Sequence, residues 1–230
     1  VLLAKHVGSK VHILHVSTAG SVDLVRWAKA QGIAVTAEAT PHHLSLDHTE
    51  VRSYDPMFKV NPPLRPREDV EALRRGVVDG TIDVIGTDHA PHPIEEKDCE
   101  WAVAANGMIG LETALSVVQE SLVNAGLIDW EDVARLMSYE PARICASPDQ
   151  GRPVAAGEPA NLCFVDPYAR REISGRASRS KSHNTPWEGR TLPGRVMYTV
   201  HRGVPTVWEG GLRSHEDVMA DRAKLDRVGR

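Results

Sequence analysis

The chain has 230 residues, of which 41% are hydrophobic and 25% are charged, and its formal net charge is −4. This composition allows a sizeable core and excludes a chain that is disordered by composition. The small negative charge gives no electrostatic reason to expect binding to nucleic acid or to an anionic membrane surface. No apolar run approaches the ~18 residues that a membrane span needs. We therefore expect a chain that folds around a sizeable core.

Cysteine usage points to a reducing compartment. The three cysteines, Cys99, Cys145 and Cys163, are odd in number and far apart in sequence. This pattern argues against a disulfide framework or a zinc site built from cysteines, and it favours a cytoplasmic location. The locally basic stretch 170–190 is interpreted as a solvated loop rather than a nucleic-acid site.

The first 140 residues alternate predicted strands with predicted helices. Residues 1–6 look like the end of a helix. Strands are expected over 11–16, 33–39 and 82–86, and helices over 22–31, 67–79, 111–125 and about 129–137. This alternation is typical of βαβ units and a parallel sheet. The sequence thus predicts an α/β fold.

The pattern changes from about residue 150. Short apolar segments over 161–165, 194–200 and 203–208 are separated by glycines and have no helical segments between them. They predict a small antiparallel β layer. We expect residues 1–150 to form the α/β part, 151–211 a β-rich segment, and 212–230 a charged tail. That tail is either disordered or helical, with Ser214 or Asp217 as the N-cap.

Histidine and acidic side chains follow the predicted strands at their carboxyl ends. In parallel α/β folds, functional side chains gather at this edge of the sheet. After 82–86, Pro91 prevents the strand from continuing. The candidate side chains are His15, Glu38, His42, His43, Asp88, His89 and His92.

The candidate side chains match the chemistry of metal-dependent hydrolysis. Neutral imidazole and carboxylate groups together suit Zn²⁺ or a similar divalent ion. Such an ion lowers the pKa of a bound water towards ~7, which favours attack on an amide carbonyl. A neighbouring aspartate can accept the proton and return it to the leaving nitrogen.

Each candidate also has a purely structural interpretation. His12 is expected to be a hydrogen-bonded structural histidine. His42 and His43 fit a turn in which one ring caps and the other packs, and Glu38 fits a solvated acid at a strand end equally well. An aspartate such as Asp88 before His-Ala-Pro often only caps a turn. The combination of motifs, rather than any single residue, decides between these interpretations.

Several motifs in order resemble one family. They are His12-Ile13-Leu14-His15-Val16-Ser17-Thr18-Ala19, Glu38-Ala39-Thr40-Pro41-His42-His43-Leu44, Asn61-Pro62-Pro63-Leu64-Arg65, Thr87-Asp88-His89-Ala90-Pro91-His92, Gly110-Leu111-Glu112-Thr113 and Ser182-His183-Asn184-Thr185-Pro186. Up to about residue 211 the chain resembles the dihydroorotases of bacterial type, within the amidohydrolase superfamily. The resemblance implies the second half of a (β/α)8 TIM-type barrel, followed by a small β-sandwich segment.

The resemblance also implies a reaction and its cofactor. The family interconverts N-carbamoyl-L-aspartate and L-dihydroorotate in de novo pyrimidine biosynthesis, with two Zn²⁺ ions in each complete active site. The complete enzyme is expected to be a homodimer that binds neither nucleic acid nor membrane.

Residue roles follow from the matching positions. By resemblance, His15 is a zinc ligand, and Asp88 is both a metal ligand and the catalytic acid/base. Asn61 and His92 contact substrate. Asn106-Gly107 stands where backbone groups of the family contact substrate, although the family usually has an aromatic residue in place of Asn106.

Other family members and a non-enzyme remain alternatives. Glu38 matches a position that helps to hold an additional metal in some relatives, but Leu14 stands where those relatives have cysteine, so no third site is expected. Allantoinases and hydantoinases share the metal chemistry. A histidine four residues beyond Asp88, such as His92, can bind the carboxylate that dihydroorotate has, which favours dihydroorotase.

The sequence lacks the family's first metal motif. No His-x-His occurs, and the bridging acid or carboxylated lysine and a further histidine that precede His15 in the family are not present. We therefore expect the chain to correspond to the C-terminal part of the barrel, without about its first four or five strands. The isolated chain is expected to be inactive, and a non-catalytic truncated homologue is the competing interpretation.

Overall fold

The computed structural model describes residues 1–228. Contacts within the chain define two compact units. The first comprises Val1–Met137 and Glu172–Leu192, and the second comprises Ser138–Arg171 and the residues from Pro193 onward. The predicted site residues all belong to the first unit.

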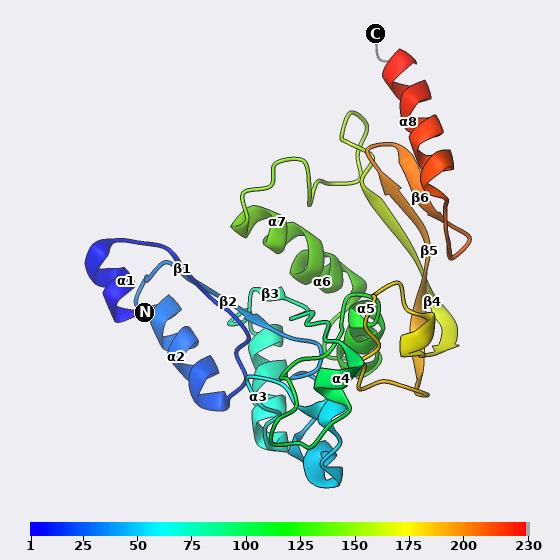
Figure 1. Ribbon diagram of the computed structural model, residues 1–230. Helices are drawn as coiled ribbons and strands as arrows, with labels where there is room; N and C mark the ends of the chain where they lie inside the picture. The colour runs from blue at the N-terminus through cyan, green and yellow to red at the C-terminus, as the bar shows by residue number, and fades with distance from the viewer. Residues whose placement is uncertain (229–230) are drawn as a thin grey trace. The chain divides into compact units, whose positions relative to one another are not determined.

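A three-stranded parallel sheet forms the centre of the first unit (Figure 1). Its strands are β1 (Val11–Ile13), β2 (Val35–Ala39) and β3 (Val84–Ile85), in that spatial order. Both strand pairs are parallel, with Val11 opposite Val35 and Glu38 opposite Val84. The predicted parallel arrangement is confirmed. The first strand ends at Ile13 and is therefore shorter than the predicted 11–16. It cannot continue to residue 16 because the backbone at His15 is left-handed, with a φ of 50°.

Helices α2 (Ala19–Ala30) and α3 (Arg67–Val78) lie next to each other beside this sheet, and the short α1 (Leu2–Val7) precedes β1. Thr18 caps α2, since its hydroxyl oxygen accepts a hydrogen bond from the Ser21 N–H at 3.2 Å. Gly76 of α3 allows close packing, because a Cβ at this position would lie 3.0 Å from a methyl group of Val22. The core here includes Val16, Val22, Val25, Ala37, Ala39, Leu73, Val77, Ile82, Ile85, Val118, Leu122 and Leu136.

The connections between these elements contain short helices. Two 3₁₀ helices span His48–Ser53 and Pro56–Phe58, and α4 spans Ile94–Lys97. The helix predicted over 111–125 is α5 (Ala114–Val118), which continues as a π-helix over Gln119–Val123. The helix predicted from about residue 129 is α6 (Trp130–Ala134), which continues as a π-helix over Arg135–Tyr139.

A second core cluster includes residues from the segment 172–192. It contains Leu46, Val60, Leu64, Met108, Val117, Ile173, Trp187 and Leu192. The interpretation of 170–190 as a solvated loop is therefore wrong for Ile173, Asn184 and Trp187, all of which are buried. The basic residues of the segment suggested solvent, but the apolar Ile173 and Trp187 between them pack into the core.

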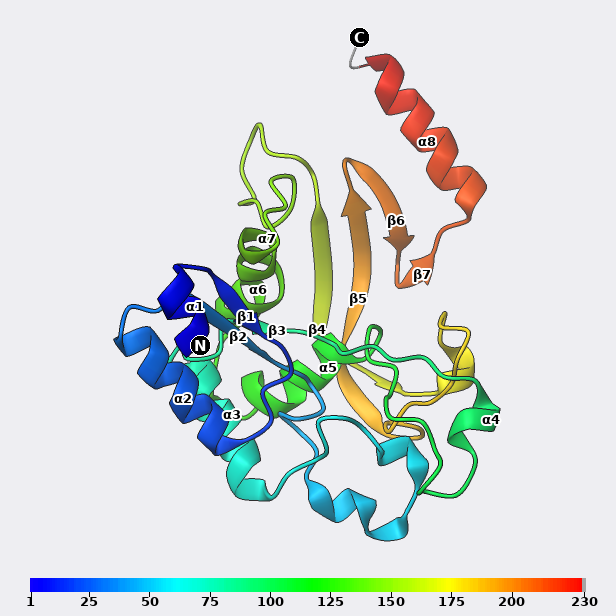
Figure 2. The ribbon, with the colours of Figure 1, turned by 60° about the vertical axis from the view of Figure 1, so that its left-hand side comes forward.

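The second unit contains a four-stranded sheet and two helices. The strands are β4 (Leu162–Glu172), β5 (Thr191–His201), β6 (Val204–Trp208) and β7 (Gly211–Leu212), in this spatial order. β6 is antiparallel to both of its neighbours, and Figure 2 shows β4, β5 and β6 side by side. This agrees with the predicted antiparallel layer. The described residues of this unit form one sheet, so the β-sandwich stays a prediction.

The helices of the second unit are α7 (Glu140–Ile144) and α8 (His215–Val228). The Ser214 hydroxyl accepts a hydrogen bond from the Asp217 N–H at 3.1 Å, as expected of an N-cap. The predicted tail is thus helical over α8, and its residues 229–230 lie outside the described residues. Over residues 1–228, no helix has both the length and the apolar character needed to cross a membrane.

Candidate active site

His15 and Asp88 meet at the carboxyl edge of the parallel sheet. His15 follows β1 and Asp88 follows β3, and His15 Nε2 lies 3.5 Å from Asp88 Oδ1. Both residues have a left-handed backbone, with φ of 50° and 46°. This conformation is uncommon for residues other than glycine and tends to cluster at functional sites. The sheet therefore brings together the two residues that the sequence predicts as metal ligands.

Glu38 joins this pair from the end of β2. Its Oε1 lies 2.7 Å from His15 Nδ1, and its Oε2 lies 3.5 Å from Nε2 of His12. The side chain is buried, since the residue is only 8% exposed. The interpretation of Glu38 as a solvated acid is therefore wrong. The reason is Gly86, directly after the neighbouring strand β3. A Cβ at Gly86 would lie 2.6 Å from the Glu38 carboxylate, so glycine leaves the space that the carboxylate occupies.

The surroundings of Asp88 shift the pKa of its carboxyl upward. Burial raises the pKa of the Asp88 carboxyl, and nearby Glu38 raises it further, while the positive charge that His15 can carry opposes the rise. A raised pKa makes a carboxylate a better proton acceptor. The site thus has a group that can accept and release a proton.

The adjacent histidines His42 and His43 are both buried in the turn after β2, with ring centroids 4.4 Å apart. The His43 ring lies between the Thr40 hydroxyl at 2.7 Å and the Pro62 carbonyl at 2.9 Å. Burial lowers the pKa of His43 to about 4 and lowers that of His42 well below its usual value. Nε2 of His42 has no hydrogen-bond partner among the described residues.

Two further histidines have structural contacts. Nδ1 of His89 accepts a hydrogen bond from the Gly110 N–H at 3.0 Å. Nδ1 of His12 lies 2.7 Å from the Thr36 hydroxyl, which agrees with a hydrogen-bonded structural role. Neither residue is free to act as a metal ligand through Nδ1.

His15, Asp88 and Glu38 offer the nitrogen and oxygen donors that Zn²⁺ prefers. The Nδ1 atom of His15 is buried, and among residues 1–228 it makes no hydrogen bond. The Glu38 Oε1 atom lies near this nitrogen without forming a hydrogen bond to it. No three histidine, cysteine or acidic side chains of the described residues are grouped closely enough to enclose an ion. The donor set therefore fits part of a zinc site, in which His15 and Asp88 would supply two ligands.

The predicted substrate residues lie on loops that are tied to one another. His92 Nε2 contacts the Asn106 carbonyl at 2.9 Å. The Gly107 N–H donates to the Lys59 carbonyl at 2.9 Å. Lys59 precedes the exposed Asn61 by two residues. Gly107 has a φ of 135°, and a Cβ there would lie 2.5 Å from that of Ala90. These contacts tie His92, Asn106 and Gly107 to the loop that carries Asn61.

Two residues of this network were not predicted from the sequence. Asn184 donates through its side-chain amide to the carbonyls of Ala90 and Gly107, at 2.9 and 3.2 Å. Lys97 is fully buried, although it stands in the polar run 95–98, which gives no sign of burial. The motif 182–186 was a signal for Asn184, whereas the sequence carries none for Lys97.

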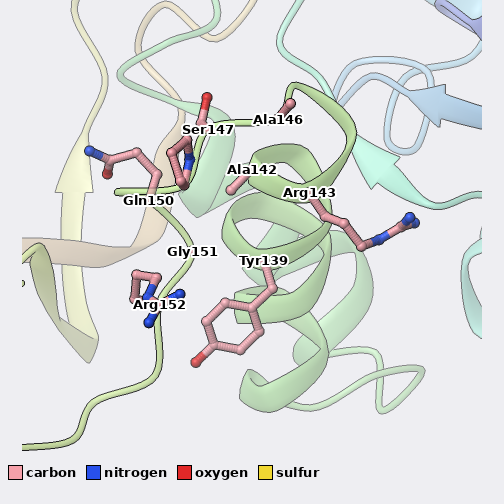
Figure 3. Close-up of a pocket in the computed structure, with 9 residues that line it drawn as sticks. Tyr139, Ala142, Arg143, Ala146, Ser147, Gln150, Gly151 and Arg152 are labelled. Carbon is pink, nitrogen blue, oxygen red and sulfur yellow. The ribbon is translucent and has the colours of Figure 1, made fainter. Parts of the chain in front are cut away.

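A separate pocket lies in the second unit and holds none of these residues. It has a volume of about 410 Å³ and is lined by Tyr139, by residues of α7 and by the following loop (Figure 3). Its two arginines are ion-paired, Arg143 with Glu140 and Arg152 with Glu158.

Comparison with known proteins places the chain in a family. Residues 2–205 match the amidohydrolase family. The chain is 62% identical over 212 residues to a dihydroorotase of Streptomyces coelicolor and 59% identical over 212 residues to one of Leifsonia xyli. The matches cover 92% of this chain but 50% and 48% of those proteins. The chain thus spans about half the length of the curated relatives that it matches.

Solved structures agree with this relationship. An L-hydantoinase (dihydropyrimidinase) from Arthrobacter aurescens superimposes with a TM-score of 0.87 at 30% identity, covering 93% of this chain and 48% of the hydantoinase. A D-hydantoinase from a Thermus species superimposes with a TM-score of 0.85 at 25% identity, covering 94% and 48%. The α/β unit with its strand-end histidine and aspartate, together with these matches, establishes that the chain belongs to the amidohydrolase family.

Proposed function

We propose that this chain supplies one half of the active site of a dihydroorotase, which interconverts N-carbamoyl-L-aspartate and L-dihydroorotate in de novo pyrimidine biosynthesis. The observation that carries the proposal is the convergence of His15 and Asp88, 3.5 Å apart, at the carboxyl edge of the sheet. The 62% identity to a dihydroorotase supports the choice of substrate.

In this proposal, each site residue has a defined task. His15 and Asp88 would hold Zn²⁺, of which the complete site would bind two, and when bound the metal would supply Lewis-acid chemistry towards the substrate carbonyl. Asp88 takes the proton of the attacking water and delivers it to the ring nitrogen as the carbon–nitrogen bond breaks. Asn61, His92 and the backbone of Asn106-Gly107 bind and orient the substrate, including its carboxylate.

The rest of the chain has a place in the same scheme. Residues 1–150 supply the second part of a TIM-type barrel, 151–211 supply the β-sandwich segment, and 212–230 form the tail. The complete enzyme is a cytoplasmic homodimer. Because two ligands do not complete a zinc site, the isolated chain is inactive.

A hydantoinase-type reaction is the second candidate function. It is favoured by the superposition on the L-hydantoinase, which is 30% identical to this chain over the aligned residues. The two reactions differ in the substrate carboxylate, which dihydroorotate has and dihydrouracil lacks. His92, which follows Asp88 by four residues, is the residue proposed to recognise it.

A chimeric enzyme tests the proposed function. The matching part of the Streptomyces coelicolor dihydroorotase is replaced by this chain, and hydrolysis of dihydroorotate, dihydrouracil and hydantoin is measured with Zn²⁺. We expect turnover of dihydroorotate alone. Preferred turnover of dihydrouracil or hydantoin would instead establish the hydantoinase alternative, and a folded, zinc-loaded chimera without any turnover would support a non-catalytic homologue.

Replacement of Asp88 tests the proposed proton transfer within the same chimera. Asp88→Asn should lower kcat by roughly three orders of magnitude or more, because the amide cannot carry the proton. Asp98→Asn, on the exposed end of α4, is the matched control and should leave kcat unchanged. An Asp88→Asn variant with the unsubstituted rate would remove Asp88 from the mechanism.

A further inference from the structure

The amine of Lys97 is buried among three backbone carbonyl groups. The residue is 0% exposed, and Nζ donates to the carbonyls of Gly107 at 2.8 Å, Ala105 at 2.9 Å and Lys59 at 3.3 Å. An ammonium group has three donors, so the three carbonyls satisfy it. A buried cation without such partners would be strongly unfavourable.

These three carbonyls belong to two loops that carry predicted substrate residues. Lys59 precedes Asn61 by two positions, while Ala105 and Gly107 flank Asn106. The Gly107 N–H also donates to the Lys59 carbonyl. The two loops are therefore joined both by this backbone hydrogen bond and by the Lys97 amine. Removing the amine would leave the buried Gly107 carbonyl and the half-buried carbonyls of Ala105 and Lys59 with weaker pairing.

Lys97 also acts on the peptide group that joins Ala105 to Asn106. This peptide is planar and trans, so the Asn106 N–H points away from the carbonyl that Lys97 holds. Among residues 1–228, the Asn106 N–H has no hydrogen-bond acceptor. A positive charge on the carbonyl side of a peptide strengthens its N–H as a donor, because hydrogen bonds in a chain polarise one another.

We infer that Lys97 is a positioning residue for substrate binding. It fixes the backbone of 105–107 against that of Lys59 and strengthens the Asn106 N–H as a donor to an anionic group of the substrate. This inference rests on the proposed function for the identity of the substrate, a carboxylate-bearing cyclic amide. The fixing of the backbone can be tested without it.

Amide hydrogen exchange of the 230-residue chain tests the fixed backbone. In Lys97→Met, the Gly107 N–H should exchange about tenfold faster than in the unsubstituted chain, whereas amides of α3 should not change. Lys59→Met is the matched control, because the Lys59 amine donates to the carbonyls of Trp101 and Ala104 instead. Unchanged exchange at Gly107 in Lys97→Met would overturn the inference.

The wild-type chain provides a measurement that does not depend on a variant folding. Its Gly107 N–H should be protected from exchange, because it is bonded within the network that Lys97 closes. If this amide exchanges as fast as a free peptide, Lys97 does not fix the loop. Lys97→Gln, which keeps two donors on a shorter side chain, should lie between the unsubstituted chain and Lys97→Met.

The chimera separates positioning from a general loss of folded enzyme. Lys97→Met should raise KM for dihydroorotate by about tenfold with kcat changed less than about threefold, since substrate contacts loosen and Asp88 remains in place. A merely structural role would reduce the active fraction, lowering apparent kcat at constant KM, and would overturn the inference. If the unsubstituted chimera does not hydrolyse dihydroorotate, the proposed function fails, and the exchange experiment still decides the role of Lys97.

Discussion

Glu38 shows how one residue depends on the absence of a side chain on the next strand. A Cβ at Gly86 would lie 2.6–2.8 Å from the Glu38 carboxyl atoms, so Gly86→Ala must displace a buried carboxylate. We expect the free energy of unfolding to fall by about 1–3 kcal/mol, as for other overpacked sites. Gly20→Ala is the control, because nothing lies within 4 Å of a Cβ at that helical position. Urea denaturation of both variants measures the difference, and equal stabilities would contradict the crowding.

The buried histidine His43 makes stability depend on pH. Its pKa is about 4 in the folded chain, against about 6.5 for a free histidine, so below pH 6.5 the unfolded state binds the proton that the folded state refuses. The contribution of His43 to the free energy of unfolding is therefore fully present above pH 6.5 and is lost as the pH falls towards 4. The difference corresponds to about 3 kcal/mol.

Urea denaturation between pH 7 and pH 4 measures this loss. His43→Gln should reduce the pH dependence, because glutamine does not titrate, and the part that remains is that of the buried His42, whose pKa is also lowered. The control His48→Gln replaces an exposed histidine and should keep the slope of the unsubstituted chain. Equal slopes in the unsubstituted chain and in His43→Gln would contradict the assignment.

At the scale of elements, Asp83 fastens the start of β3 to β2 and to helix α2. Its carboxylate accepts hydrogen bonds from the Ala37 N–H at 2.8 Å and from the Lys29 amine at 2.8 Å. Asp83→Ala leaves a strand N–H and a cation without their partner, which should cost about 2 kcal/mol. Asp83→Asn keeps an acceptor for Ala37 and should cost less.

The exposed ion pair of Asp23 with Arg26 provides the control for Asp83. Asp23→Ala should change the free energy of unfolding by less than about 0.5 kcal/mol, because water screens exposed pairs. Thermal or urea unfolding of Asp83→Ala, Asp83→Asn and Asp23→Ala measures how much each substitution lowers the free energy of unfolding. A cost for Asp83→Ala no larger than that for Asp23→Ala would show that the carboxylate does not hold the strand.

The sequence predicts elements whose pattern is local. The parallel strands and the helix starting near Trp130 follow from apolar periodicity and from capping by Asp129. The burial of Glu38 and Lys97 could not be predicted in this way. Glu38 lies beside Gly86, and the Lys97 amine lies beside carbonyls of residues up to 38 positions away in the sequence. Only the fold brings these groups together.

At the scale of the whole molecule, the incomplete ligand set determines how the chain should bind metal. Zinc in proteins usually has four ligands, and in the proposed function His15 and Asp88 would supply two of them. The matched dihydroorotases are about twice as long as this chain, so the chimera with Streptomyces coelicolor sequence contains the other half of such a protein. We expect the isolated chain to bind Zn²⁺ at least about a hundredfold more weakly than the chimera.

Competition with a chromophoric chelator measures this difference, and a dihydroorotate assay accompanies it. The isolated chain should show no turnover at any zinc concentration at which it stays folded. In the chimera, His15→Ala should reduce the zinc content and abolish turnover, whereas the exposed control His6→Ala should change neither. Tight zinc binding by the isolated chain, with turnover that a chelator removes, would mean that this half of the fold completes the site by another route, such as the association of two copies.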